Sequence, residues 1–263
     1  MGINGLLNEL FQLLPVFLQY FFGCGAESQP DTLPTAILST HTADGFGSYV
    51  MRDMTDEMKA FAAHWKKLDV KFDGICTGFF ASAEQIRFAE SFLRDFGGED
   101  TLIVVDPVLG DNGALYGCFS EEYVQAMRTL CKAARLITPN HTEAALLAGC
   151  SMDTDMNELL EKLPVENVII TGVRRGEEIG YCARLDGEYT EIFRPCIPQT
   201  LHSTGDVFAS ALCGALMNGK TMPRALEDAA KFCDDCVQKT VKRGEAHWYS
   251  LAFEDVLKEE RER

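Results

Sequence analysis

The chain has 263 residues, of which 46% are hydrophobic and 24% charged, which is typical of a folded protein with a sizeable core. Its formal net charge of −16 argues against a nucleic-acid-binding surface, because such a surface needs a basic stripe. The charge does not argue against a nucleotide ligand, since backbone N–H groups and metal ions can hold phosphates locally.

The N-terminal residues 6–23 are strongly apolar but include Glu9 and Pro15. No basic residue precedes them, so they make a poor signal peptide and a poor membrane span. We expect an amphipathic helix that is kinked or restarted at Pro15, and no membrane partner.

From about residue 34 onward, strand and helix signals alternate. Strands are expected at 35–39, 72–78, 102–107, 136–138 and 168–171, followed by a hairpin that joins 180–184 to 189–194. Helices are expected at 55–68, 83–95, 120–134, 142–148, 154–163, 207–218, 222–241 and 251–261. This order predicts a single α/β domain over 1–263, a three-layer α/β/α sandwich with a mostly parallel central sheet.

Ten cysteines are scattered along the chain without the spacing of a disulfide framework. Several lie in apolar runs, which predicts reduced thiols in the cytoplasm. Cys233 and Cys236 form a lone CxxC on an expected helix, so a helical packing role explains them better than zinc or redox chemistry.

Three of the buried strands end in polar residues, namely Asp106, Thr138 and Thr171. Ligands of open parallel sheets bind beyond the carboxyl ends of the strands, so these side chains are expected to face one crevice.

The segment 203–206, Ser-Thr-Gly-Asp, places small residues and one carboxylate directly before an expected buried helix. Unpaired N–H groups at a helix N-terminus can hold an anion such as phosphate. Asp206 beside that anion could take a proton from an attacking hydroxyl. The alternative is an ordinary helix N-cap aspartate.

Three motifs occur together in a fixed order: D-P-V-L-G-D-N-G-A-L-Y at 106–116, T-P-N-H-T-E at 138–143 and S-T-G-D at 203–206. With L-P-T-A-I-L-S-T-H-T at 33–42 and C-T-G-F at 76–79, they resemble the pyridoxal kinases of the ribokinase superfamily. The resemblance covers roughly residues 33–250. It implies a ribokinase-like fold and phosphorylation of the 5′-hydroxymethyl group of pyridoxal, pyridoxamine or pyridoxine by ATP.

The resemblance also implies a role for each matching residue. Asp206 would be the general base and, with Gly205, would contact the substrate, while Ser203, Thr204 and Gly205 would form the anion hole. The other implied groups are ATP-binding Asp106, Asn140, Glu143, Thr171 and Tyr116; Mg²⁺-binding Glu143 and Asp106; monovalent-cation-binding Asp111 and Thr138; and substrate-binding His41, Thr42 and Phe79. It further implies a homodimer.

Structural explanations compete with several of these roles. Glu143 could simply be an acid in the first turn of a helix, and Thr171 could be a turn residue. Phe79 and Tyr116 could belong to the core, as large aromatic side chains usually do.

The chain departs from the family pattern at residues 1–32, where an apolar strand and a vitamin-contacting loop are expected, and at Ser203, where glycine is usual. Two alternatives therefore stay open: a hydroxymethylpyrimidine kinase, or a relative that binds nucleotide or vitamin without turnover.

Overall fold

The computed structural model describes residues 31–40, 48–199, 201–244 and 251–261. The chain divides into two compact units. The sheet unit comprises 33–36 and 53–196, and the helical unit comprises the remainder. The expected N-terminal helix with its break at Pro15 lies outside the described residues.

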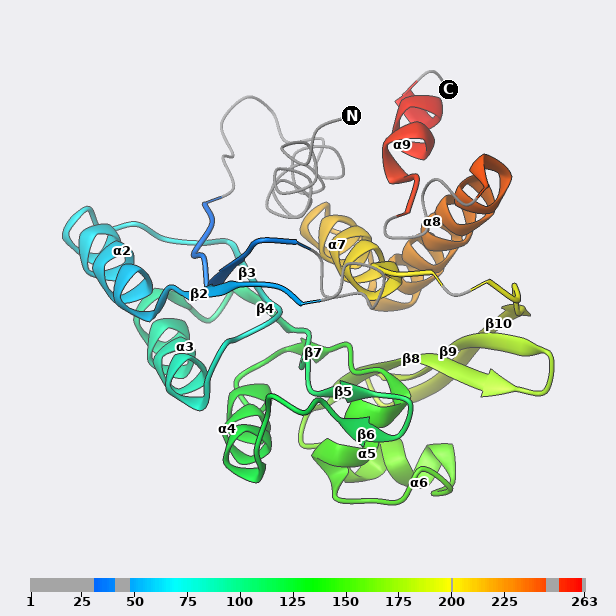
Figure 1. Ribbon diagram of the computed structural model, residues 1–263, viewed down its shortest axis with the longest axis horizontal. Helices are drawn as coiled ribbons and strands as arrows, with labels where there is room; N and C mark the ends of the chain where they lie inside the picture. The colour runs from blue at the N-terminus through cyan, green and yellow to red at the C-terminus, as the bar shows by residue number, and fades with distance from the viewer. Residues whose placement is uncertain (1–30, 41–47, 200, 245–250, 262–263) are drawn as a thin grey trace. The chain divides into compact units, whose positions relative to one another are not determined.

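A six-stranded sheet, with the order β10-β9-β8-β7-β4-β3, forms the centre of the sheet unit (Figure 1). The strands β3, β4, β7 and β8 are parallel, and β9 and β10 extend the sheet as antiparallel strands. Their bounds are β3 Gly74–Thr77, β4 Leu102–Val105, β7 Leu136–Ile137, β8 Asn167–Arg175, β9 Glu178–Leu185 and β10 Glu188–Pro195. The predicted α/β class with a mostly parallel sheet is confirmed.

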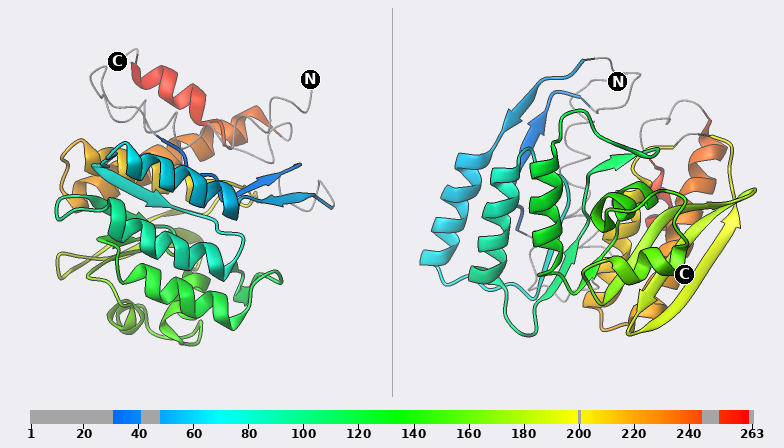
Figure 2. Two further views of the ribbon diagram at one scale, coloured as in Figure 1. Left: turned by 90° about the vertical axis from the view of Figure 1, so that its left-hand side faces the viewer. Right: turned by 90° about the horizontal axis from the view of Figure 1, so that it is seen from below.

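The helices of the sheet unit pack on one face of this sheet and follow one another along the chain. Figure 2 shows α2, α3 and α4 side by side. Their apolar faces meet Val105, Ile137 and Ile170 from the sheet in one continuous core. The bounds are α2 Thr55–Lys67, α3 Ala83–Phe96, α4 Glu121–Cys131, α5 His141–Ala148 and α6 Met156–Lys162.

Two short sheets were not predicted. The strands β1 (Ala36–Leu38) and β2 (Met51–Asp53) pair with each other, as do β5 (Gly110–Asp111) and β6 (Ala114–Leu115). The strand expected at 35–39 is therefore present as β1, whereas β2, β5 and β6 are too short to show an apolar pattern.

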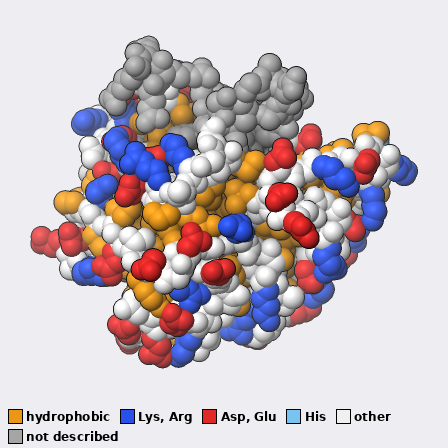
Figure 3. All heavy atoms as spheres, turned by 180° about the vertical axis from the view of Figure 1, so that it is seen from behind, with side chains coloured by type: hydrophobic (Ala, Val, Ile, Leu, Met, Phe, Trp, Pro, Cys, Tyr) orange, Lys and Arg blue, Asp and Glu red, His pale blue; other side chains and the backbone are white. Residues whose placement is uncertain are grey.

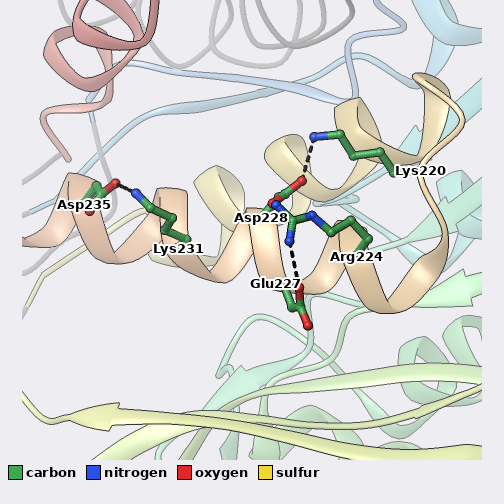
Figure 4. Close-up of polar contacts among 6 residues, drawn as sticks. All are labelled: Lys220, Arg224, Glu227, Asp228, Lys231 and Asp235. Atoms are coloured by element: carbon green, nitrogen blue, oxygen red, sulfur yellow. Dashed lines mark hydrogen bonds and ion pairs between the residues drawn. The ribbon is translucent and has the colours of Figure 1, made fainter. Parts of the chain in front are cut away.

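The helical unit contains α7 (Thr204–Met217), α8 (Met222–Arg243) and α9 (Phe253–Arg261). Helices α7 and α8 pack against each other, and α8 buries Leu226 and Phe232 on one side. The polar side of α8 carries ion pairs, with Asp228 contacting Lys220 at 2.6 Å and Arg224 at 2.9 Å (Figure 4). Exposed pairs of this kind contribute little stability, so the buried side holds α8 in place.

Two predicted boundaries are wrong. Helix α7 begins at Thr204 instead of 207, because Ser203 takes a left-handed conformation (φ 65°) that ends the loop one turn earlier. Strand β8 continues past Thr171 to Arg175, because Gly172 (φ +66°) forms a bulge instead of a stop.

Candidate active site

Asp106 directly follows β4 and begins a tight turn. Its N–H donates to the Thr77 carbonyl at 3.0 Å, which extends the pairing of β3 with β4 by one residue. Its own carbonyl accepts the N–H of Val108 at 3.0 Å, so Pro107 lies at the apex. The half-buried Asp106 is thus fixed at the carboxyl edge of the sheet, as the sequence predicted.

Asn140 and Glu143 form a capping box at the start of α5. The Asn140 side chain accepts the Glu143 N–H at 2.9 Å, and Glu143 Oε2 accepts the Asn140 N–H at 2.7 Å. Each residue also has a distant partner. Glu143 Oε1 accepts the N–H of Leu109 at 3.0 Å, and Asn140 Nδ2 donates to the Gly110 carbonyl at 2.8 Å. The pair therefore fastens the 106–111 loop to α5.

Glu143 is 5% exposed. Burial raises its pKa to about 7, while the backbone N–H groups of Asn140 and Leu109 oppose that shift and the nearby Asp111 adds to it. A carboxylate in this position is poised to gain from a cation, because a positive charge would offset its desolvation.

Asp111 lies in the β5–β6 hairpin, whose turn residues Asn112 (φ 52°) and Gly113 (φ 79°) are both left-handed. The Asp111 carboxylate accepts the N–H of Asn112 at 2.8 Å and is exposed. The N–H of Gly113 donates to the Thr142 hydroxyl at 2.8 Å, which ties the hairpin to α5. Thr142 was not among the predicted site residues, and only this long-range bond identifies its role.

Thr138 and Thr171 come from the neighbouring parallel segments that contain β7 and β8. Thr138 follows β7 and is 3% exposed; its hydroxyl oxygen has no hydrogen-bond partner within the described part of the chain. The N–H of Thr171 donates to the Pro139 carbonyl at 2.9 Å, so β8 stays paired with the chain just beyond β7. The structure thus brings Asp106, Thr138 and Thr171 to one edge of the sheet.

Two aromatic residues of the predicted site lie near a third, Phe119. The ring of Tyr116 is 6.2 Å from Phe119 and the ring of Phe79 is 6.0 Å from it, as measured between centroids. Tyr116 keeps 43% of its surface exposed, and partial burial together with nearby carboxylates raises its pKa to about 12. Phe79 is half-buried, and its carbonyl accepts the Thr35 hydroxyl at 2.8 Å. Tyr116 and Phe79 are therefore both packed against a neighbouring ring and partly open to solvent.

Asp206 occupies the third position of α7, and Ser203 is the N-cap residue. The simple alternative, that Asp206 is the N-cap, is therefore wrong. Solvent reaches Asp206, yet the protein atoms around its carboxyl desolvate it and raise its pKa, whereas a hydrogen bond from the Ser203 side chain lowers it. The exposed Gly205 has open space where a side chain would project.

Cys233 contacts the first turn of α7. The buried Cys233 thiol on α8 donates to the Thr204 carbonyl, with a sulfur–oxygen distance of 3.7 Å. Sequence reasoning correctly placed Cys233 and Cys236 in a packed helix but did not predict this contact. The described cysteines form no disulfide.

His41 and Thr42, the predicted contacts to the polar edge of the substrate, lie outside the described residues. Within the described ranges, no three His, Cys, Asp or Glu side chains gather as a preformed metal site. No helix of the described part is long and apolar enough to cross a bilayer. Figure 3 shows acidic and basic side chains interspersed on one face, with hydrophobic groups between them.

The fold and the ordered acidic and small-residue motifs define a kinase of the ribokinase-like class. The sequence pattern of the phosphomethylpyrimidine kinase family matches residues 35–250, and the chain belongs to this family.

Relatives with solved structures are similar over nearly the whole chain. Pyridoxal kinase from Lactobacillus plantarum is 31% identical, with a TM-score of 0.85 over 95% of this chain and 90% of that one. A Bacteroides thetaiotaomicron protein, described as a phosphomethylpyrimidine kinase and crystallised with pyridoxal, is 35% identical. Its TM-score is 0.84 over 94% of this chain and 88% of its own. Among characterised sequences, the hydroxymethylpyrimidine/phosphomethylpyrimidine kinase of Bacillus subtilis is 28% identical over 187 residues, 68% of each chain.

Proposed function

We propose that the protein transfers the γ-phosphoryl group of ATP to the 5′-hydroxymethyl group of pyridoxal, pyridoxamine or pyridoxine. The observation that carries this choice is the 35% identity, over nearly the whole chain, to a protein crystallised with pyridoxal. The 31% identity to a pyridoxal kinase of the same fold supports it.

The nucleotide would bind at the carboxyl edge of the sheet unit. Asn140 already holds the loop at Gly110 through its amide, so its position relative to the phosphates would be fixed before ATP arrives. Thr171 offers a hydroxyl from β8, and the open surface of Tyr116 could cover the phosphates. Preorganisation of this kind lowers the entropy lost on binding.

The donor set fits Mg²⁺ bound together with a nucleotide. Mg²⁺ in kinases is held by one or two carboxylates, while phosphates and waters supply the other ligands, so a preformed cluster of three side chains is not required. Asp106 and Glu143 would hold it, partly through water, because each oxygen of Glu143 already accepts one N–H. When bound, the ion would neutralise charge that develops on the phosphates.

Asp111 and Thr138 would hold a monovalent cation. The buried Thr138 hydroxyl oxygen, which lacks a hydrogen-bond partner within the described residues, is an available ligand. Its burial without a partner costs free energy that a bound cation or water would recover.

Phosphoryl transfer would depend on the first turn of α7. The carboxylate of Asp206 would accept the proton of the hydroxymethyl group as its oxygen attacks the γ-phosphorus. The N–H groups of Thr204, Gly205 and Asp206 lie in the first turn, where a helix has no internal acceptor for them, and they would stabilise charge on the transferred group. Desolvation raises the pKa of Asp206, which makes its carboxylate a better proton acceptor than an ordinary aspartate.

The vitamin ring would stack on Phe79, and His41 and Thr42 would contact its polar edge. Within the sheet unit, Phe79 keeps part of its ring open while the Thr35 hydroxyl fixes its backbone. The single-domain organisation over 1–263 and the homodimer stay predictions of the same proposal.

A hydroxymethylpyrimidine is the second candidate substrate, because the Bacillus subtilis kinase named for that reaction is 28% identical over 68% of this chain. Both substrates present a hydroxymethyl group on a nitrogen heterocycle, so the same base and anion hole would serve either one.

The deciding experiment is a coupled ADP-release assay with Mg²⁺ and ATP. Pyridoxal, pyridoxamine, pyridoxine and hydroxymethylpyrimidine are compared with a reaction that lacks an acceptor. Higher kcat/KM with the pyridoxal-type rings supports the proposal, and preference for the pyrimidine refutes it in favour of the second candidate. Nucleotide binding by calorimetry without turnover on any acceptor identifies a binding protein instead.

A further inference from the structure

Side chains from distant parts of the chain hold the loop that follows β3. The Thr35 hydroxyl donates to the Phe79 carbonyl at 2.8 Å, 44 residues further along the chain. The Tyr123 hydroxyl on α4 donates to the next carbonyl, that of Phe80, at 2.9 Å, and Tyr123 is buried. Hydroxyl groups from outside the loop therefore fix two successive carbonyls of it.

Gln85 on α3 holds the same loop from a fully buried position, with 0% of the residue exposed. Its Oε1 accepts the N–H of Ala81 at 2.8 Å. Its Nε2 donates to the Thr35 carbonyl at 2.8 Å and to the Thr55 hydroxyl at 3.1 Å. The amide oxygen and the amide nitrogen thus both have partners. A buried amide that is satisfied in this way fixes the groups it joins, whereas an unsatisfied one costs free energy.

A role in capping α3 does not account for these contacts. Ser82 is the N-cap residue, and its hydroxyl accepts the Gln85 N–H at 3.3 Å. In a capping box, the glutamine side chain would accept the N–H of the N-cap residue itself. Gln85 accepts the N–H one residue earlier, and the Thr35 carbonyl already accepts the N–H of Met54 at 3.1 Å. The Gln85 side chain therefore links the loop after β3 to the segment that contains Thr35.

These contacts surround the backbone of Phe79, whose half-buried ring keeps part of its surface open. The Phe79 ring lies 6.0 Å from that of Phe119, as measured between centroids, and Phe119 stacks on Tyr123 at 3.8 Å. Tyr123 therefore supports the loop through its hydroxyl and through this stack. A ring that packs against other rings, on a loop whose carbonyls are fixed, is preorganised to stack on a planar ligand.

We infer that Thr35 and Gln85 are positioning residues for Phe79: their hydrogen bonds to the loop after β3 set the plane on which the vitamin ring stacks. The inference rests on the proposed function, in which Phe79 contacts that ring. Thr35 acts directly on the Phe79 carbonyl. Gln85 acts on the loop two residues further on and on the backbone of Thr35.

Two substitutions at Thr35 separate the hydroxyl from the shape of the side chain. Thr35→Val removes the hydroxyl and keeps the branched shape, whereas Thr35→Ser keeps the hydroxyl. Thr35→Val should raise KM for pyridoxine about three- to tenfold and leave KM for ATP unchanged, because the loop loses one of the bonds that orient Phe79. Thr35→Ser should restore KM for pyridoxine to that of the wild type.

Thr101→Val is the matched control. The Thr101 hydroxyl also donates to a phenylalanine carbonyl, that of Phe72 at 2.9 Å, but just before β3 instead of just after it. The control should lower resistance to urea and leave KM for pyridoxine and KM for ATP unchanged.

A role that is exerted through Phe79 has a further signature. In a Phe79→Ala background, Thr35→Val should have no additional effect on KM for pyridoxine, because the ring that it positions is gone. A full additional loss in that background would show that Thr35 acts elsewhere, and it would overturn the inference. Gln85→Met should raise the same KM and lower resistance to urea, since the partners of the amide lose their bonds. The Thr35 variants decide the question if Gln85→Met does not fold.

Calorimetry with pyridoxine and no nucleotide gives a readout that does not depend on turnover. A pyridoxine Kd that weakens in Thr35→Val and recovers in Thr35→Ser supports the inference. An unchanged Kd in Thr35→Val, an equal loss of affinity for pyridoxine and for ATP, or the same loss in Thr101→Val overturns it. Failure of the proposed function gives a different result, namely a wild type that phosphorylates no pyridoxal-type ring, and the inference would then fall with the function.

Discussion

Removing the charge of Glu143 should change how stability depends on pH. The folded protein raises the pKa of this carboxyl from 4.5 to about 7 through burial, so folding favours its protonated form. The resulting stabilisation is fully present below pH 4.5 and is lost as the pH rises through 7. A difference of roughly 2.5 pH units corresponds to a ceiling of about 3 kcal/mol in the free energy of unfolding.

In Glu143→Gln the pH-dependent contribution to the free energy of unfolding disappears. A loss of stability that does not depend on pH takes its place. Each carboxylate oxygen accepts one backbone N–H, from Asn140 or from Leu109, and an amide has only one oxygen. One buried N–H therefore loses its acceptor, which costs about 1–3 kcal/mol. The variant should be less stable than the wild type at pH 5, and the difference should narrow or reverse by pH 8.

Urea unfolding at pH 5, 6, 7 and 8, without nucleotide or metal, measures both curves. Glu158→Gln is the matched control, because Glu158 also lies in the first turn of a helix but is exposed and paired with Lys162 at 2.6 Å. Its curve should run parallel to that of the wild type. A curve for Glu143→Gln that is also parallel would show that Glu143 titrates as an ordinary carboxyl, and the reasoning from its burial would fail.

Three further substitutions test the proposed roles. Asp206→Asn should lower kcat about 100-fold or more while the nucleotide Kd measured by calorimetry changes little, and unchanged turnover would remove Asp206 as the base. Gly205→Ala should keep or slightly raise the Tm, because a Cβ at this position meets no atom within 4 Å and alanine favours a helix. The added methyl group should nevertheless crowd the phosphoryl group and lower kcat about tenfold or more. Full activity would show that the phosphoryl group binds elsewhere. Phe79→Ala should raise KM for the vitamin about tenfold and leave KM for ATP alone, and an equal effect on both would indicate a packing role.

The sequence predicted most of the sheet because its central strands are apolar runs. Strand β4 consists of four aliphatic residues and is bounded by polar ones, and such a run forms when both faces of a strand are buried. The β5–β6 hairpin was missed since two-residue strands carry no periodicity, although Asn112-Gly113 is a typical turn pair. At Gly172 the turn signal was real, but it marks a bulge within β8.

The candidate site residues were chosen by motif, whereas their hydrogen-bond partners required the structure. The interval of three residues between Asn140 and Glu143 is compatible with a capping box, and the box is present. No local pattern indicates that Glu143 also accepts the N–H of Leu109, 34 residues earlier in the chain. The start of α7 was misplaced for a similar reason, because left-handed geometry at a serine cannot be read from the identity of that residue.

The N-termini of α5 and α7 differ in the charge of the ligand that each would bind. At α5 the capping box closes the N-terminus with its own side chains, and the buried carboxylate that does so would gain from a cation. At α7 the N-cap side chain of Ser203 caps no first-turn N–H, so it leaves these N–H groups available, and they would gain from an anion. A phosphotransferase that uses a metal-bound triphosphate needs both kinds of site. The same local element, the first turn of a helix, can serve either purpose, and the conformation of one N-cap residue determines which.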